Sequence, residues 1–190
     1  ITGSLGTGKT TVAKIFAGFG AKVLDADRIA HRQMRPGTAC FQLIVNAFGK
    51  DILTEGRIDR KKIAARVFHN VKQLHKLEQI VHPAVRKEIA GQIRRCKENR
   101  RSRVVVLDVP LLFEAKLNKY VDLVVVVKTT RATQIDRATK RLGMSRADAL
   151  RRINAQMPLR QKIRLADIII DNDGDLIKTK KQVAQIWEKL

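Results

Sequence analysis

The sequence predicts an α/β fold, in which a parallel sheet is flanked by helices. Apolar runs at residues 103–109, 122–127 and 168–170 alternate with segments whose apolar residues recur at helical spacing. Uninterrupted apolar runs of this kind are typical of strands that helices cover on both faces. The alternation of strands with helices then favours a parallel sheet over an antiparallel one.

The first element is a glycine-rich loop followed by an amphipathic helix that ends at Gly18 and Gly20. Gly3-Ser4-Leu5-Gly6-Thr7-Gly8-Lys9-Thr10 matches G-x-x-x-x-G-K-[ST] in full. In this motif backbone N–H groups converge on phosphate oxygens at the positive end of a helix. The motif predicts a phosphate-binding loop (P-loop), with Lys9 on the β- and γ-phosphates of ATP and Thr10 on Mg²⁺.

A short strand is expected at residues 22–25, directly before Asp25-Ala26-Asp27. A P-loop normally joins the end of a strand to the start of a helix. The chain reaches its loop after Ile1 and Thr2, so we expect about five or six further apolar residues upstream, one strand in length.

Residues 28–102 are predicted to be almost entirely helical, and we interpret them as a subdomain inserted into the sheet. Breaks are expected at Pro36-Gly37, Phe48-Gly49, Glu55-Gly56 and His82-Pro83. Asp59 and Asn70 are candidate helix starts. Further helices are expected at 130–142, 145–156 and 175–190. The whole chain, 1–190, is predicted to be a single P-loop NTPase-type domain.

Asp25 and Asp27 follow a strand, at the edge of the sheet where α/β proteins bind ligands. A kinase that acts on an alcohol needs a carboxylate to accept or orient the hydroxyl proton. One aspartate could therefore be catalytic while the other binds Mg²⁺ or its waters. The alternative is that both are turn or helix-cap residues.

The net charge of +21 is extreme. It is consistent with nucleic-acid binding, with attraction of polyanionic small molecules such as ATP, or with a highly solvated surface. The chain has a single Trp and a single Tyr for stacking on bases, so we expect no nucleic-acid partner beyond non-specific contact. No apolar stretch approaches the ~20 residues that span a bilayer, and we expect a cytoplasmic protein without a membrane partner.

Sequence blocks along nearly the whole chain resemble the dephospho-CoA kinase family. They keep the order and approximate spacing of that family, and together they are highly specific. The blocks are residues 2–11, Leu24-Asp25-Ala26-Asp27, Pro36-Gly37, Phe48-Gly49, Gly56-Arg57-Ile58-Asp59-Arg60, Val67-Phe68, Leu77 with His82-Pro83, Val109-Pro110-Leu111-Leu112-Phe113-Glu114, Gln134 with Arg137 and Arg141, Arg152-Ile153 with Gln156, and Ala166-Asp167 with Asp171-Asn172.

The resemblance implies ATP-dependent phosphorylation of the ribose 3′-hydroxyl of dephospho-CoA, which gives coenzyme A and ADP. Asp27 would be the base, Lys9 and Arg137 would complete the catalytic set, and the metal ligand would be Thr10. The implied ATP-binding residues are Gly6, Thr7, Gly8, Lys9, Thr10, Thr11, Arg141 and Asn172. Arg137 and Arg141 would belong to a helical lid, residues 130–156, that closes on the phosphates. The implied substrate-binding residues are Asp27, Arg60, His82, Pro110 and Leu111.

Alternatives remain at this stage for both residues and function. His82 could be structural, and Arg141 could be an exposed helix arginine. Asp108, at a strand end, could be a Walker-B-type Mg²⁺ ligand, but the family requires no acid there and its role is left unassigned. The runner-up function is a P-loop kinase acting on a nucleoside monophosphate or small alcohol. A different class of function would be a nucleic-acid-associated ATP-binding protein, which the charge alone suggests.

Overall fold

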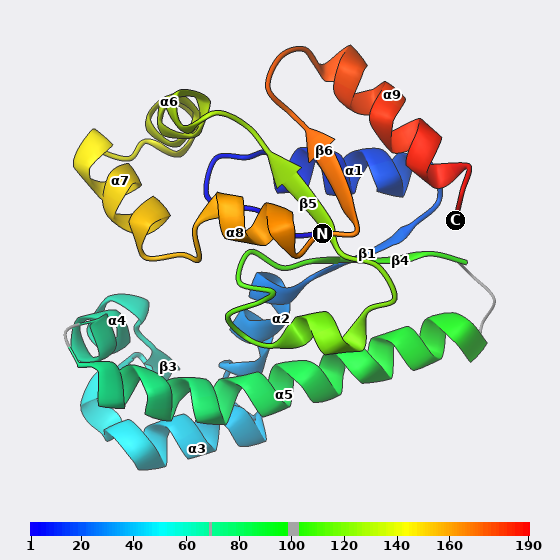
Figure 1. The fold of residues 1–190 in the computed structure, drawn as a ribbon. Coiled ribbons are helices and arrows are strands. Elements are labelled where there is room, and N and C mark those ends of the chain that lie inside the picture. The colour runs from blue at the N-terminus through cyan, green and yellow to red at the C-terminus, as the bar shows by residue number, and fades with distance from the viewer. Residues whose placement is uncertain (69, 99–102) are drawn as a thin grey trace. The chain divides into compact units, whose positions relative to one another are not determined.

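The computed structural model describes residues 1–68, 70–98 and 103–190 (Figure 1). The chain forms two compact units. The first contains Ile1–Leu24 and Asn99–Leu190, and the second contains Asp25–Glu98. The predicted insertion ended at residue 102, but residues 99–102 lie outside the described part of the chain.

The sheet of the first unit is built from two strand pairs. β1 (Lys22–Asp25) pairs with β4 (Val105–Asp108), and β5 (Val125–Lys128) pairs with β6 (Ile168–Asp171). The second pair is parallel, as predicted, with Val125 opposite Ile168. All four segments were predicted to be strands. β4 begins two residues, and β5 three residues, after the start of the corresponding apolar run.

Ile1 and Thr2 connect the two strand pairs. The Ile1 nitrogen donates to Leu107 O, and Ile1 O accepts from Val109 N at 3.0 Å. On the other side Thr2 N donates to Val125 O at 2.8 Å. Thr2 also forms a parallel bridge with Val126. The segment that leads into the P-loop therefore lies between β4 and β5.

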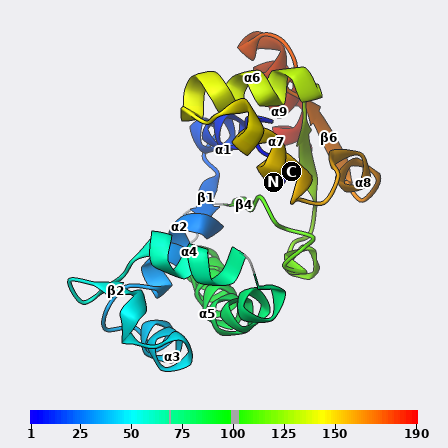
Figure 2. The same ribbon diagram turned by 90° about the vertical axis from the view of Figure 1, so that its left-hand side faces the viewer.

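Helices cover both faces of β5 and β6. α1 (Lys9–Gly18) and α9 (Leu176–Trp187) share a core with Val125, Val127 and Ile170. Val126 is also fully buried, and strand side chains alternate between faces. α8 (Leu159–Arg164) contacts β5, and Figure 2 shows it on the side opposite α1 and α9. Coverage of both faces explains the uninterrupted apolar sequence of this strand.

The remaining helices of this unit begin where the sequence predicted. α6 (Arg131–Leu142) is capped by Thr130, and α7 (Arg146–Asn154) is capped by Ser145. Ser145 Oγ accepts from Asp148 N at 3.0 Å. A short 3₁₀ helix, η2 (Leu117–Tyr120), follows β4.

The second unit is mainly helical. It contains α2 (Ala26–Gln33), α3 (Ala39–Phe48), the 3₁₀ helix η1 (Lys50–Ile52), α4 (Arg60–Phe68) and α5 (Val71–Glu98). Its core is formed by Cys40, Ile44, Phe48, Ile52, Ile63 and Val67. As predicted, Asp59 accepts the N–H groups of Lys61 and Lys62, and Asn70 accepts that of Gln73.

One prediction for this unit was wrong, and one feature was not predicted. The expected break at His82-Pro83 is absent, because α5 runs through Pro83. The expected break at Glu55-Gly56 is present, but it is the turn of an unpredicted antiparallel hairpin between β2 (Leu53–Thr54) and β3 (Arg57–Ile58). Both turn residues have positive φ (49° and 72°), the conformation of a tight two-residue hairpin turn.

No helix in the described part of the chain is long and apolar enough to cross a membrane.

Candidate active site

The P-loop packs tightly against the segment after β6. Gly8 caps α1 in the left-handed region, with φ 87°. A Cβ added at Gly8 would lie 2.1 Å from Asn172 Nδ2. Residue 8 must therefore be glycine both for its torsion angle and for space. The close packing fixes the backbone of Gly6, Thr7 and Gly8 at the positive end of α1, where anions bind.

Lys9 and Thr10 form the first turn of α1. Lys9 Nζ donates to Ser4 O at 3.1 Å, so the side chain folds back over the loop. Thr10 Oγ1 donates to Asp108 Oδ2 at 3.3 Å. Asp108 ends β4 and is 8% exposed. The structure thus brings an acidic oxygen, unassigned from the sequence, to the hydroxyl predicted to bind Mg²⁺.

Arg137 of α6 lies on the other side of the loop. Its Nη2 donates to Asn172 O at 2.9 Å. Its Nη1 is buried, with no hydrogen-bond partner among the described residues. The same atom is 3.5 Å from the position that a Gly8 Cβ would occupy. A buried guanidinium donor at a phosphate-binding loop is suited to an anionic ligand.

Asn172 connects the P-loop to α9. Its Nδ2 donates to Thr7 O at 2.8 Å, and its Oδ1 accepts from Thr179 Oγ1 at 2.9 Å. Both ends of the amide are therefore used within the protein. Contact of Asn172 with ATP stays a prediction. In the structure the Asn172 side chain links the P-loop to α9.

The loop after β4 is held from two sides. Pro110 O accepts from Thr2 Oγ1 at 3.2 Å and from Lys162 Nζ at 2.8 Å. Leu111 is 44% exposed. Lys162 is fully buried and pairs with Glu114, a contact that sequence reasoning missed. A lone lysine in an amphipathic helix gives no sequence signal for burial.

Of the other predicted nucleotide residues, Thr11 is half-buried in α1 and its N–H donates to Gly8 O at 3.0 Å. Arg141 is exposed in the last turn of α6. The structure therefore gathers the predicted loop residues, Arg137 and Asn172 in one place, and puts Arg141 one helical turn further along.

In the second unit, the two aspartates after β1 have separate roles. Asp25 is the N-cap of α2, and its carboxylate accepts from Arg28 N at 2.9 Å. Asp27 lies in the first turn of α2 and is exposed. The cap interpretation thus holds for Asp25, while the exposed Asp27 carboxylate lies at the start of a helix.

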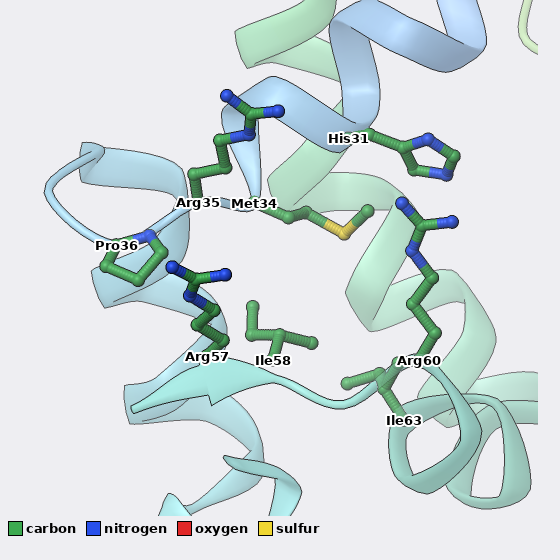
Figure 3. Close-up of a pocket in the computed structure, with 8 residues that line it drawn as sticks. All are labelled: His31, Met34, Arg35, Pro36, Arg57, Ile58, Arg60 and Ile63. Atoms are coloured by element: carbon green, nitrogen blue, oxygen red, sulfur yellow. The ribbon is translucent and has the colours of Figure 1, made fainter. Parts of the chain in front are cut away.

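The second unit also contains a cavity of about 620 Å³. Figure 3 shows the guanidinium groups of Arg35, Arg57 and Arg60 around the apolar side chains of Met34 and Ile58. The remaining lining residues are His31, Pro36 and Ile63. A cavity with three guanidinium groups and apolar walls is suited to an anionic ligand with a nonpolar part.

Only Arg60 of these lining residues was predicted from the sequence. His31 and Arg35 lie just beyond the Asp27 segment, and Arg57 shares a block with Arg60. His82, also predicted for the substrate, lies in α5 and is not among the described lining residues. Burial lowers the pKa of His82 below its ordinary value of 6.5, although the charge of Glu78 opposes this shift.

A parallel sheet between helices, with a glycine-rich loop opening α1 and an acid at the end of β4, defines a P-loop kinase. Comparison with known proteins gives the family. The chain belongs to the dephospho-CoA kinase family, whose model matches residues 1–178. Members of this family use ATP to phosphorylate dephospho-CoA in the last step of coenzyme A biosynthesis.

Curated relatives and solved structures agree with this assignment. The dephospho-CoA kinases of Carboxydothermus hydrogenoformans and Bacillus anthracis are 45% and 42% identical. Both alignments cover 100% of this chain, and 92% and 94% of the relatives. A crystal structure of TT1252 from Thermus thermophilus has a TM-score of 0.87 at 31% identity, covering 100% of this chain and 95% of that one. Dephospho-CoA kinase from Campylobacter jejuni has a TM-score of 0.72 at 26% identity, with coverages of 99% and 94%.

Proposed function

We propose that the first unit of the chain binds ATP through the P-loop, with Lys9 and Arg137 as its cationic ligands. The observation that carries the assignment is the glycine-lined loop at the start of α1, with the buried Nη1 of Arg137 beside Gly8. Fixed cations and amides stabilise the charge on the transferring phosphoryl group. Arg141 is proposed to reach the phosphates from the same helix when the lid, residues 130–156, closes.

Mg²⁺ is proposed to bind at Thr10 and Asp108. Their oxygens lie 3.3 Å apart, and hard oxygen donors are the ligands that Mg²⁺ prefers. The described residues contain no group of three or more His, Cys, Asp or Glu that could hold a metal ion. This fits a site completed by water and substrate phosphates, as is usual for Mg²⁺. The ion would neutralise charge on the phosphates.

Asp27 is proposed as the general base toward the ribose 3′-hydroxyl. It is exposed in the first turn of α2, whereas Asp25 is occupied as a cap. An exposed carboxylate can accept a proton from an alcohol as the alcohol attacks. Asp27 therefore has the accessibility that Asp25 lacks.

The cavity of the second unit is proposed to bind the acceptor, with the helical insertion as substrate-binding subdomain. Dephospho-CoA carries a diphosphate beside a long arm whose alkyl segments are linked by two amides. The three guanidinium groups suit the diphosphate, and Met34, Ile58 and Ile63 suit the arm. Contacts of His82, Pro110 and Leu111 with the acceptor stay predictions, as does a cytoplasmic location.

The proposal is tested by ADP release with a panel of acceptors at saturating ATP and Mg²⁺. We expect turnover with dephospho-CoA, and slow background hydrolysis with adenosine monophosphate or without acceptor. The variant Arg57→Ala with Arg60→Ala should raise KM for dephospho-CoA, while KM for ATP stays unchanged. Lys97→Ala with Lys87→Ala in α5 is the charge-matched control. An unchanged KM for dephospho-CoA in the arginine variant would show that the cavity does not bind this substrate.

A further inference from the structure

An ion pair with a buried lysine joins α8 to the loop that follows β4. Lys162 is fully buried, and its Nζ lies 2.9 Å from Glu114 Oε1. The same ammonium group donates to Pro110 O at 2.8 Å. A buried ammonium needs such acceptors because it has lost its hydration. The pair therefore fixes where the Glu114 carboxylate lies.

Glu114 in turn holds the segment that connects α7 to α8. Its Oε1 accepts from Met157 N at 2.9 Å. The adjacent residue, Gln156, accepts from Leu5 N with its own Oε1 at 3.0 Å. Leu5 belongs to the P-loop. A continuous path of contacts thus runs from Lys162 through Glu114, Met157 and Gln156 to the phosphate-binding loop.

This contact matters because the P-loop binds phosphate through backbone N–H groups. Their directions depend on the conformation of every peptide in the loop. The hydrogen bond from Leu5 restrains one of these peptides from outside the loop. The acceptor is Oε1 of Gln156, so this hydrogen bond uses only the carbonyl end of the side-chain amide.

We propose that Gln156 is a positioning residue for the P-loop, and that the Lys162–Glu114 ion pair holds Gln156 in place. The proposal rests on the assignment of the loop to the ATP phosphates. Gln156 fixes the Leu5 peptide, and the loop amides then match the phosphates without first being ordered. Such preorganisation contributes to the rate, because small misplacements of groups in an active site are costly.

The first test is Gln156→Ala in a steady-state assay of ADP release. We expect kcat/KM for ATP to fall by about tenfold to a hundredfold, while the melting temperature and KM for dephospho-CoA stay unchanged. Gln161→Ala, an exposed glutamine on α8, is the matched control and should behave as wild type. A purely structural role would lower the melting temperature instead. An unchanged kcat/KM for ATP overturns the proposal.

Lys9→Ala in the same assay separates this inference from the assignment on which it rests. If Lys9→Ala lowers kcat/KM for ATP and Gln156→Ala does not, only the positioning role fails. If both variants keep wild-type kinetics, the assignment of the P-loop fails, and the positioning role fails with it.

The second test concerns the ion pair. Lys162→Met alone and Glu114→Leu alone each leave a buried or half-buried charge without its partner. Both single variants should therefore have a lower melting temperature than wild type. The double variant removes both charges together with the acceptor of the Met157 N–H. We expect it to melt at a higher temperature than either single variant, yet to lose as much kcat/KM for ATP as Gln156→Ala. Lys180→Met, an exposed lysine on α9, is the control.

Adding Gln156→Ala to that double variant should cost little more activity, because residues in one chain of contacts have non-additive effects. Wild-type kcat/KM in the double variant, or a full additional loss on adding Gln156→Ala, overturns the role of the ion pair. If the double variant does not fold, the result for Gln156→Ala still decides the role of Gln156.

Discussion

At the scale of single residues, the P-loop is held by contacts from outside itself. Asn172 donates to Thr7 O, Gln156 accepts from Leu5 N, and Asp108 accepts from the Thr10 hydroxyl. The loop sequence predicts that phosphate binds here, because its glycine spacing is specific. It does not predict these three partners, since each lies about 100 residues or more away along the chain.

Gly8 gives the clearest residue-scale prediction. Gly8→Ala places a methyl group where Asn172 Nδ2 lies, on a backbone in the left-handed region. We expect ATP affinity to fall at least tenfold and the melting temperature to fall by several degrees. Gly174→Ala is the control. It also replaces a glycine with positive φ, but a Cβ there meets no atom within 4 Å. Isothermal titration with ATP measures the change. Wild-type affinity in Gly8→Ala would contradict the packing described.

His82 predicts a pH dependence of stability. Burial lowers the pKa of this histidine in the folded protein below 6.5. The unfolded chain therefore binds a proton more readily, and the contribution of His82 to stability is complete above pH 6.5 and lost as pH falls toward its folded-state pKa. Urea unfolding at a series of pH values should show His82→Gln to be less sensitive to acid than wild type over this range. An identical pH profile for the two proteins would exclude His82 as a contributor.

At the scale of elements, local signals predicted most boundaries. Thr130, Ser145 and Asp175 each cap the helix expected after them. The failures have physical causes. α5 continues through Pro83 because Val85 and Ile89 beyond the proline are buried, and that packing offsets the lost hydrogen bond. The hairpin at Glu55-Gly56 was missed because strands of two residues carry no periodicity.

The cap of α7 can be tested directly. Ser145→Ala removes the acceptor for Asp148 N, so we expect the free energy of unfolding to fall by about 1 kcal/mol. Ser145→Thr keeps the hydroxyl and should restore most of the loss. Denaturant titration of the three proteins measures the effect. Equal stability of the alanine and wild-type proteins would show that the cap does not contribute.

At the scale of the whole molecule, the sequence predicts the fold class and the family more fully than it predicts the site. The parallel sheet could be predicted because strands that are covered by helices on both faces have uninterrupted apolar sequences. The cavity of the second unit does not follow in this way, because Arg35 and Arg57 look like ordinary surface arginines among the 39 lysines and arginines of the chain. Their gathering around one cavity is a property of tertiary structure.

The central claim is that Asp27 removes the proton from the acceptor while the P-loop holds ATP. The most direct measurement is kcat for ADP release by Asp27→Asn with saturating dephospho-CoA, together with ATP affinity by titration. We predict that kcat falls by about 10²–10⁴ and that ATP affinity stays within about twofold of wild type. Asp51→Asn, at an exposed aspartate of the second unit, is the control and should keep wild-type kcat. Wild-type turnover by Asp27→Asn would contradict the account.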